Sequence, residues 1–182
     1  KQAVAWYTKA AEAGNKYSQT SLGHMLRDGI GTNKDPTAAA SWYRQAAAQD
    51  HASAIYSLAL LHERGNGVAK DRNEMKRLFL KAANLGHAEA QLNVGHYIAE
   101  TKAEELDWFR KAAQNGSGAG AYWLGAAYQE GDGVTKDLIE ATKWFKRSAE
   151  LGHDFGQFMM GQAYRDGVGV TRNLQYAKYC FE

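Results

Sequence analysis

The chain has 182 residues, and its 22 basic and 20 acidic residues give a formal net charge of +2, which supports neither nucleic acid nor an anionic membrane surface as a partner. The single cysteine, Cys180, excludes an intramolecular disulfide framework and a cysteine-based zinc site. No apolar run reaches the length of about 18 residues needed to cross a bilayer, and the first residues lack a signal-peptide pattern, so no membrane span is expected.

One pattern repeats along the whole chain. Each unit ends with a pair of adjacent residues in which the second is aromatic and the first is usually tryptophan. These pairs are Trp6-Tyr7, Trp42-Tyr43, Leu78-Phe79, Trp108-Phe109, Trp144-Phe145 and Cys180-Phe181. The first members of these pairs are 36, 36, 30, 36 and 36 residues apart. A period of this length is typical of stacked helical repeats.

In chain order, we expect a single repeat domain, residues 1–182. It begins with a partial unit of one helix at 1–14 and continues with units at 15–50, 51–86, 87–116 (shortened), 117–152 and 153–182 (truncated). Because a periodic segment runs into each end, the chain is interpreted as a fragment of a longer protein.

Each unit is predicted to contain a helix A, a glycine loop and a helix B, as in residues 117–152. Leu124 and Tyr128 are four residues apart and share the buried face of helix A. Gly125 leaves room for a closely packed helix. The loop glycines can end helix A with positive φ angles, and Asp137 can cap the first amides of helix B.

The shortened unit lacks the six residues that match 131–136, which make up the whole glycine loop. The sequence predicts that both helices of this unit remain intact. Thr101 and Glu104 form a capping-box pattern at the start of helix B. We expect the missing loop to bring the two helices together at that end and to bend the superhelix.

The repeated pattern reads small-x-x-x-Leu-Gly-x-x-Tyr-x-x-Gly-x-Gly-Val-x-x-Asp and then Ala-x-x-Trp-Tyr/Phe-x-x-Ala-Ala-x-x-Gly. It resembles the Sel-one-like repeat (SLR), a relative of the tetratricopeptide repeat, over essentially the whole chain. This resemblance implies an all-α, right-handed α/α superhelix, or solenoid, of antiparallel helix pairs that serves as a scaffold for protein contacts. It favours a bacterial periplasmic or secreted location, although the sequence itself leaves the compartment unknown.

No motif indicates catalysis, a cofactor or a metal ion. The glycine loops fit neither of the common phosphate-binding patterns. His51, His87 and His153 take the same turn position in three units, which indicates capping or packing. Cys180 replaces the helix B tryptophan and is interpreted as a packing residue. We therefore do not expect an enzyme.

Binding surfaces of solenoids usually lie on the concave side, along the helix A faces that do not pack on helix B. The candidate groove residues that follow from this register are Tyr17, His24, Asn93, His96, Trp123, Glu130, Phe155, Met159 and Gln162. Trp123 is interpreted either as an exposed groove residue or as a contact between neighbouring repeats.

A row of carboxylates recurs at the end of helix A, namely Asp28, Glu100, Glu130 and Asp166, with Arg64 interrupting it. The row either favours basic partners or is ordinary solvated charge.

Two functions remain open, together with a weaker third. The favoured one is a non-catalytic scaffold that binds a protein or peptide segment in the concave groove. The alternative is a glycan- or peptidoglycan-fragment-binding module of a bacterial envelope protein. The third is an architectural spacer that stacks on other repeats of the parent chain through apolar surface at residues 1–13 and 176–181. Disulfide-rich members of the family are disfavoured as a model for this chain because it lacks their paired cysteines.

Overall fold

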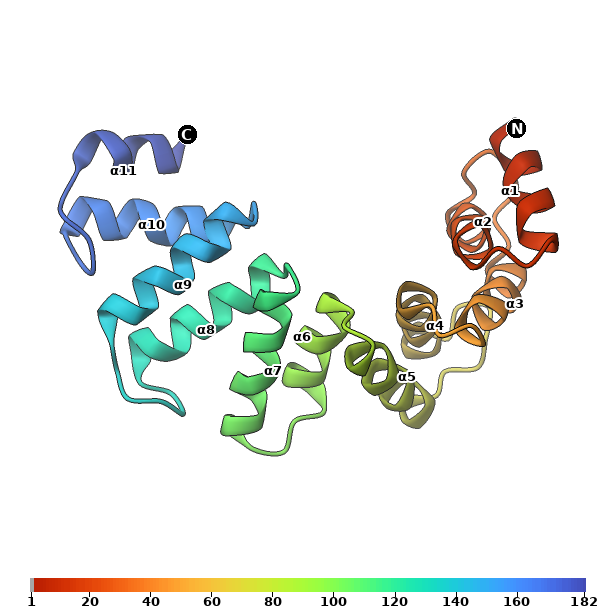
Figure 1. Cartoon of the computed structure of the whole chain (residues 1–182), viewed down its shortest axis with the longest axis horizontal. Helices are drawn as coiled ribbons and strands as arrows, with labels where there is room; N and C mark the ends of the chain where they lie inside the picture. The colour runs from red at the N-terminus through yellow and green to blue at the C-terminus, as the bar shows by residue number, and fades with distance from the viewer. Residues whose placement is uncertain (1) are drawn as a thin grey trace. The chain divides into compact units, whose positions relative to one another are not determined.

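The computed structural model describes residues 2–182, and within this range the chain contains helices and no strands. The helices are α1 (Gln2–Glu12), α2 (Lys16–Asp28), α3 (Pro36–Ala47), α4 (Ala52–Arg64), α5 (Arg72–Asn84), α6 (Ala88–Tyr97), α7 (Lys102–Gln114), α8 (Gly118–Glu130), α9 (Leu138–Glu150), α10 (Asp154–Asp166) and α11 (Leu174–Phe181) (Figure 1). The predicted all-α class is confirmed. Lys1, the first residue of the expected partial unit, lies outside the described residues.

Two compact units are distinguished, one ending at His87 and one running from Ala88 to Glu182. In the first unit α1 packs on α2, α2 on α3, α3 on α4 and α4 on α5; in the second, each helix from α6 to α10 packs on the next. Packing between sequence neighbours is the arrangement expected of a repeat protein. The expectation that the chain forms a single domain stays a prediction.

The predicted signals at the helix ends are confirmed. A glycine with φ between 70° and 76° follows four of the helix A segments, at Gly29, Gly65, Gly131 and Gly167. Each following helix B begins at an Asp or Asn whose side chain accepts hydrogen bonds from the free backbone amides, at Asp35, Asp71, Asp137 and Asn173. Local sequence therefore sets where these helices begin and end.

Gly125 allows the close helix packing that the sequence predicts. A Cβ atom at this position would lie 2.7 Å from the ring of Phe145, which is buried in the paired helix α9. The same ring contact is found between Gly23 and Tyr43, between Gly95 and Phe109, and between Gly161 and Phe181. The absence of a side chain on helix A thus admits the aromatic ring of helix B.

The prediction that both helices of the shortened unit remain intact is wrong for α6. This helix has 10 residues and ends at Tyr97, whereas α2, α4, α8 and α10 each have 13. Without the six loop residues, the chain has to reverse direction within residues 98–101, so the last turn of helix A is used as the link. The predicted bend of the superhelix stays a prediction.

Helix α7 does keep its full length of 13 residues, and its capping box differs in one detail. Thr101 Oγ1 accepts a hydrogen bond from the amide of Glu104 at 3.2 Å, as predicted. The carboxylate of Glu104 accepts in return from the amide of Glu100 at 3.1 Å, one residue before the expected partner. This bond fastens the short link to the start of α7.

The histidines at the recurring turn position pack against neighbouring rings. His51 and His153 precede α4 and α10 without a side-chain capping bond. His51 instead contacts the edge of the Tyr17 ring at a centroid distance of 5.0 Å, and His87 stacks on Tyr56 at 4.4 Å. The packing interpretation is therefore correct for this position.

Candidate binding surface

Five aromatic side chains of the second unit form a continuous run of ring contacts, here called the aromatic surface: His96 of α6, Tyr122 and Trp123 of α8, His153 before α10, and Phe155 of α10. Centroid distances along the run are 5.1 Å from His96 to Trp123, 5.4 Å from Trp123 to Tyr122 and 5.7 Å from Tyr122 to Phe155. Contacts of this kind hold rings in preferred edge-on or tilted arrangements.

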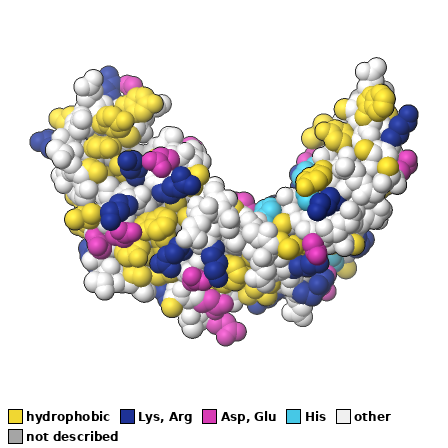
Figure 2. Space-filling view, in the orientation of Figure 1, with side chains coloured by type: hydrophobic (Ala, Val, Ile, Leu, Met, Phe, Trp, Pro, Cys, Tyr) yellow, Lys and Arg dark blue, Asp and Glu magenta, His cyan; other side chains and the backbone are white. Residues whose placement is uncertain are grey.

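Trp123 is both packed and exposed, and its place in a binding groove stays a prediction. Its ring meets the His96 ring edge-on, at an interplanar angle of 82°, and lies 6.4 Å from the buried ring of Phe109. The residue nevertheless keeps 43% of its surface exposed, and Phe155 keeps 62%. Figure 2 shows that hydrophobic side chains of the second unit reach the surface between basic and acidic ones.

A first cavity of about 270 Å³, here called the Trp123 pocket, lies beside this ring between α6, α7 and α8. Its lining includes His96, Trp123 and Glu130, which are three of the predicted groove residues. Lys102 also lines it, and its ammonium group is 2.9 Å from the carboxylate of Glu105 and 2.7 Å from that of Asp132.

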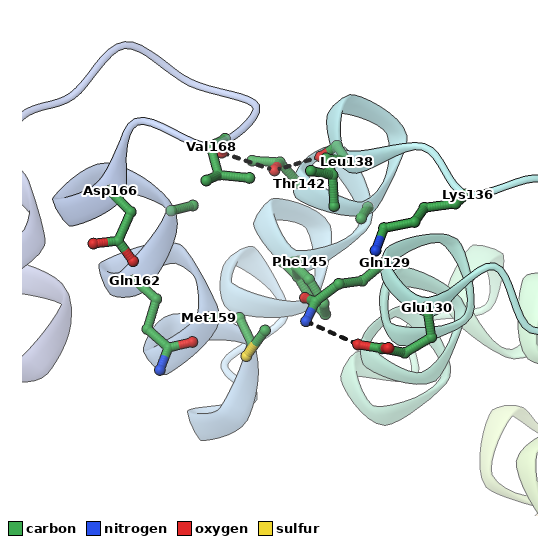
Figure 3. A pocket seen from close by; sticks show the side chains of 12 residues that line it. Gln129, Glu130, Lys136, Leu138, Thr142, Phe145, Met159, Gln162, Asp166 and Val168 are labelled. Carbon is green, nitrogen blue, oxygen red and sulfur yellow. Dashed lines mark hydrogen bonds between the residues drawn. The ribbon is translucent and has the colours of Figure 1, made fainter.

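A second cavity of about 310 Å³, here called the Met159 pocket, lies between α8, α9 and α10. Met159 and Gln162 of α10 line one side, and Glu130 of α8 lines the other (Figure 3). Phe145 of α9 lies between them, and Gln129 donates a hydrogen bond to Glu130 at 3.3 Å. Glu130 therefore belongs to the lining of both pockets.

The structure brings six of the nine predicted groove residues together in the second unit, either in the aromatic surface or in the two pockets: His96, Trp123, Glu130, Phe155, Met159 and Gln162. Asn93 lies half-buried on α6 and lines neither pocket. Tyr17 and His24 belong to α2 of the first unit.

His24 contacts α4 within its own unit. Its Nε2 atom lies 3.1 Å from the hydroxyl of Ser57, and that hydroxyl donates its proton to the carbonyl oxygen of Ser53. Burial lowers the pKa of His24, with a further contribution from nearby Arg27, so the neutral ring is favoured.

The predicted carboxylate row does not form one continuous acidic line. Glu100 follows the end of α6 and is no longer on a helix A face. Asp28 and Asp166 each form an ion pair with the preceding arginine, at 2.6 and 2.8 Å. Hydrogen bonds from Arg27 and Arg165 lower the pKa values of these two carboxyls. Within residues 2–182, Glu130 is the member of the row that lies on helix A without a cationic partner.

The helix A register did not predict Lys102, Glu105, Asp132 or Tyr122 as parts of the surface. The first three come from helix B and from a loop, so they reach the Trp123 pocket only because neighbouring repeats pack together. Comparing helix B and loop positions across the 36-residue period would have singled out these three, since Lys102, Glu105 and Asp132 each have a counterpart in the Met159 pocket.

The residues described by the structure contain no cluster of three or more His, Cys, Asp or Glu side chains suited to a metal ion. Cys180 is half-buried against the Ala141, Phe145 and Met160 cluster, and burial raises the pKa of its thiol. Across residues 2–182, none of the helices is long and apolar enough to cross a bilayer.

The family model described as Sel1 repeat matches residues 1–15, 16–51, 52–87, 106–117, 118–153 and 155–182. The chain belongs to the Sel1 repeat family, and the resemblance seen in its sequence is confirmed. The match omits residues 88–105, which contain α6 and the shortened link. The Sel1 repeat fold is in general a protein-interaction scaffold, and the family is typically non-catalytic.

Solved structures confirm the helical solenoid fold. A Sel1 repeat protein from Oxalobacter formigenes is 29% identical with a TM-score of 0.79, over 92% of this chain and 69% of that one. A protective antigen of uropathogenic Escherichia coli strains, which displays an SLR fold, is 36% identical with a TM-score of 0.81, over 98% of this chain and 39% of the antigen.

An immunity protein from Pseudomonas aeruginosa is 22% identical with a TM-score of 0.69, over 98% of this chain and 70% of that one, and shows the fold alone. A comparison with curated proteins gave no match.

Proposed function

We propose that the chain is a non-catalytic scaffold that binds a segment of a partner protein on the aromatic surface and in the two pockets beside it. The observation that supports this most is Trp123, which is held by ring contacts on α6, α7 and α8 and yet is 43% exposed. Solvent-exposed aromatic anchors beside pockets are typical of the residues that dominate binding energy at interfaces.

The ring contacts of these side chains support the same function. A side chain that is already fixed by its neighbours loses little conformational entropy when a partner binds. Trp123 contacts three other rings, and Phe155 contacts Tyr122 and His153. The aromatic surface is therefore preorganised for binding.

A second candidate is the binding of a glycan or peptidoglycan fragment. It is supported by the amide groups of Gln129 and Gln162 in the Met159 pocket, because amides can hydrogen-bond to sugar hydroxyls while nearby exposed rings supply apolar contact. In this case saturable shifts of Gln129, Gln162 and Trp123 resonances are expected on titration with muropeptides. The absence of any shift at millimolar concentration would remove this candidate.

The scaffold function is tested with peptides selected on the purified protein from a random peptide display library. Trp123→Ala is expected to weaken the binding of the selected peptides roughly tenfold or more, as for an interface hot spot. Dissociation constants are measured by fluorescence polarisation, and circular dichroism checks that the helix content is unchanged.

Trp6→Ala is the matched control, because Trp6 is 71% exposed on α1 and lies outside the proposed surface. It should bind the selected peptides like the unmodified chain. If Trp123→Ala also binds them normally, the proposed surface is wrong.

A further inference from the structure

We propose that the Trp123 pocket takes the cationic side chain of a lysine or arginine in the bound segment, and that the Met159 pocket does not. The inference rests on the proposed function and adds to it the chemistry of the partner. It is carried by a comparison of the two pockets, which are the same place in successive repeats.

The equivalence of the pockets follows from their residues. Nine lining residues of the Met159 pocket lie 36 positions after nine lining residues of the Trp123 pocket. Met159 corresponds to Trp123, Asp166 to Glu130, and Phe145 to Phe109. Differences at these nine positions therefore reflect substitution, whereas Gln129, Glu130 and Lys136 of the Met159 pocket have no counterpart 36 positions earlier in the lining of the Trp123 pocket.

The Trp123 pocket has an excess of negative charge. Its charged lining consists of three carboxylates and one lysine. Lys102 already pairs with both Glu105 and Asp132, which leaves Glu130 as the carboxylate without a cationic partner within residues 2–182. Glu130 is exposed, and its printed contact is the hydrogen bond at 3.3 Å from neighbouring Gln129. A cation entering this pocket would meet a carboxylate that is free to pair with it.

The rings of the pocket favour the same ligand. A guanidinium or ammonium group is attracted to an aromatic face, most strongly to that of tryptophan. Trp123 lines the pocket together with His96 and Phe109. Burial lowers the pKa of His96, so its ring is uncharged at neutral pH and does not repel the cation.

The Met159 pocket differs in both features. It shares Glu130 with the Trp123 pocket, but the ammonium group of Lys136 also lines it and opposes a second cation. Methionine replaces the tryptophan, and Gln162 takes the position of Ala126. Asp166 takes the position of Glu130 but is paired with Arg165 at 2.8 Å. Leu138, Ala141 and Val168 replace the charged Lys102, Glu105 and Asp132. This second pocket suits an apolar or amide side chain, so the two pockets would read different residues of an extended segment.

The first test uses single-residue probes. N-acetyl-arginine amide and the neutral N-acetyl-glutamine amide are titrated separately into isotope-labelled protein, and amide, indole and imidazole resonances are followed. The arginine probe is expected to shift resonances of His96, Trp123 and Glu130, with the glutamine probe giving no saturable shift there. Glu130→Gln should weaken arginine binding roughly fivefold or more, as expected for loss of a charge-assisted contact.

Glu140→Gln is the matched control, because Glu140 is a carboxylate of the same unit that pairs with Lys143 and lines neither pocket. It should bind the arginine probe normally. Equal binding by the Glu130 and Glu140 variants, or equal shifts with the neutral probe, would overturn the proposal.

The second test separates this inference from the proposed function. Peptides selected on the unmodified chain should be enriched in lysine and arginine at one position, and the enrichment should disappear when selection is repeated on Glu130→Gln. Peptides that depend on Trp123 but show no basic position would leave the scaffold function in place and refute the cation pocket. Binding that does not depend on Trp123 would contradict the scaffold surface itself.

Discussion

At the residue scale, the contact between a helix A glycine and a helix B ring determines how closely a helix pair can pack. Ala59 takes the glycine position in the second full repeat and is completely buried. One extra methyl group is therefore tolerated where the surrounding chain has adjusted to it. In the repeat that contains Gly125, the same methyl group would contact Phe145 at 2.7 Å and the carbonyl oxygen of Ala141 at 3.1 Å.

We predict that Gly125→Ala destabilises the protein by about 1–3 kcal/mol, because a buried ring and a backbone carbonyl have to move. The reverse change, Ala59→Gly, should destabilise by about 1 kcal/mol through the loss of helix propensity. Urea unfolding followed by circular dichroism measures both. Stabilisation by Gly125→Ala, as at an unconstrained helix glycine, would show that the ring contact does not limit packing.

At the element scale, the helices begin and end through bonds made within a few residues. Asp137 accepts hydrogen bonds at 2.9 and 3.0 Å from the amides of Ile139 and Glu140, and Asn173 performs the same task at the start of α11. An amide oxygen thus replaces a carboxylate at the equivalent cap without loss of the helix start. The negative charge adds a favourable interaction with the helix dipole.

Removal of the cap should therefore matter more than removal of its charge. Asp137→Ala is predicted to lower the free energy of unfolding by about 0.5–2 kcal/mol. Asp137→Asn is predicted to lower it by only about 0.3 kcal/mol. Thermal and urea unfolding of the two variants provide the measurement. Equal losses in both variants would mean that charge, and not the hydrogen bonds, determines the effect.

At the scale of the whole molecule, stability is distributed along the chain because, within each of the two units, each helix packs on its sequence neighbours. Phe145 illustrates this: its ring is 2% exposed and lies in a cluster with Ala141 and Met160, so it joins α9 to α10. In repeat proteins the loss of a buried side chain mainly destabilises its own repeat and the adjacent repeats.

Phe145→Ala should destabilise its surroundings by about 3–5 kcal/mol through loss of buried surface and creation of a cavity. Hydrogen exchange measured by mass spectrometry is expected to show faster exchange in α8, α9 and α10, with α2 and α3 close to their original rates. A uniform increase over all helices would instead indicate a chain that unfolds as one cooperative block.

Much of the fold could be predicted from the sequence because its determinants are local and recur. Each determinant acts within its own helix pair, as the caps Asp35 and Asp137 and the contact of Gly125 with Phe145 show. The spacing of these residues along the sequence therefore predicts the helix pairs. The end of α6 could not be predicted in the same way. It depends on how few residues can reverse the chain direction, and an alignment with longer repeats hides that limit.

The candidate surface was predictable only in part, for a related reason. His96, Trp123 and Glu130 follow from the helix A register, but Lys102 and Asp132 enter the Trp123 pocket from other elements. Their approach depends on the packing of one repeat against the next. The charge state of the pocket depended on further pairing, since the bonds of Lys102 decide which carboxylate remains free.

The 36-residue offset between the two pockets also bears on how such an array can diversify. The positions that line the pockets are separate from the glycines and caps that form the helices. Substitution at positions such as 123 and 159 can therefore change the ligand of one repeat while its neighbour and its scaffold stay the same. Under the proposed function, the preference of each pocket could then be changed separately along the array.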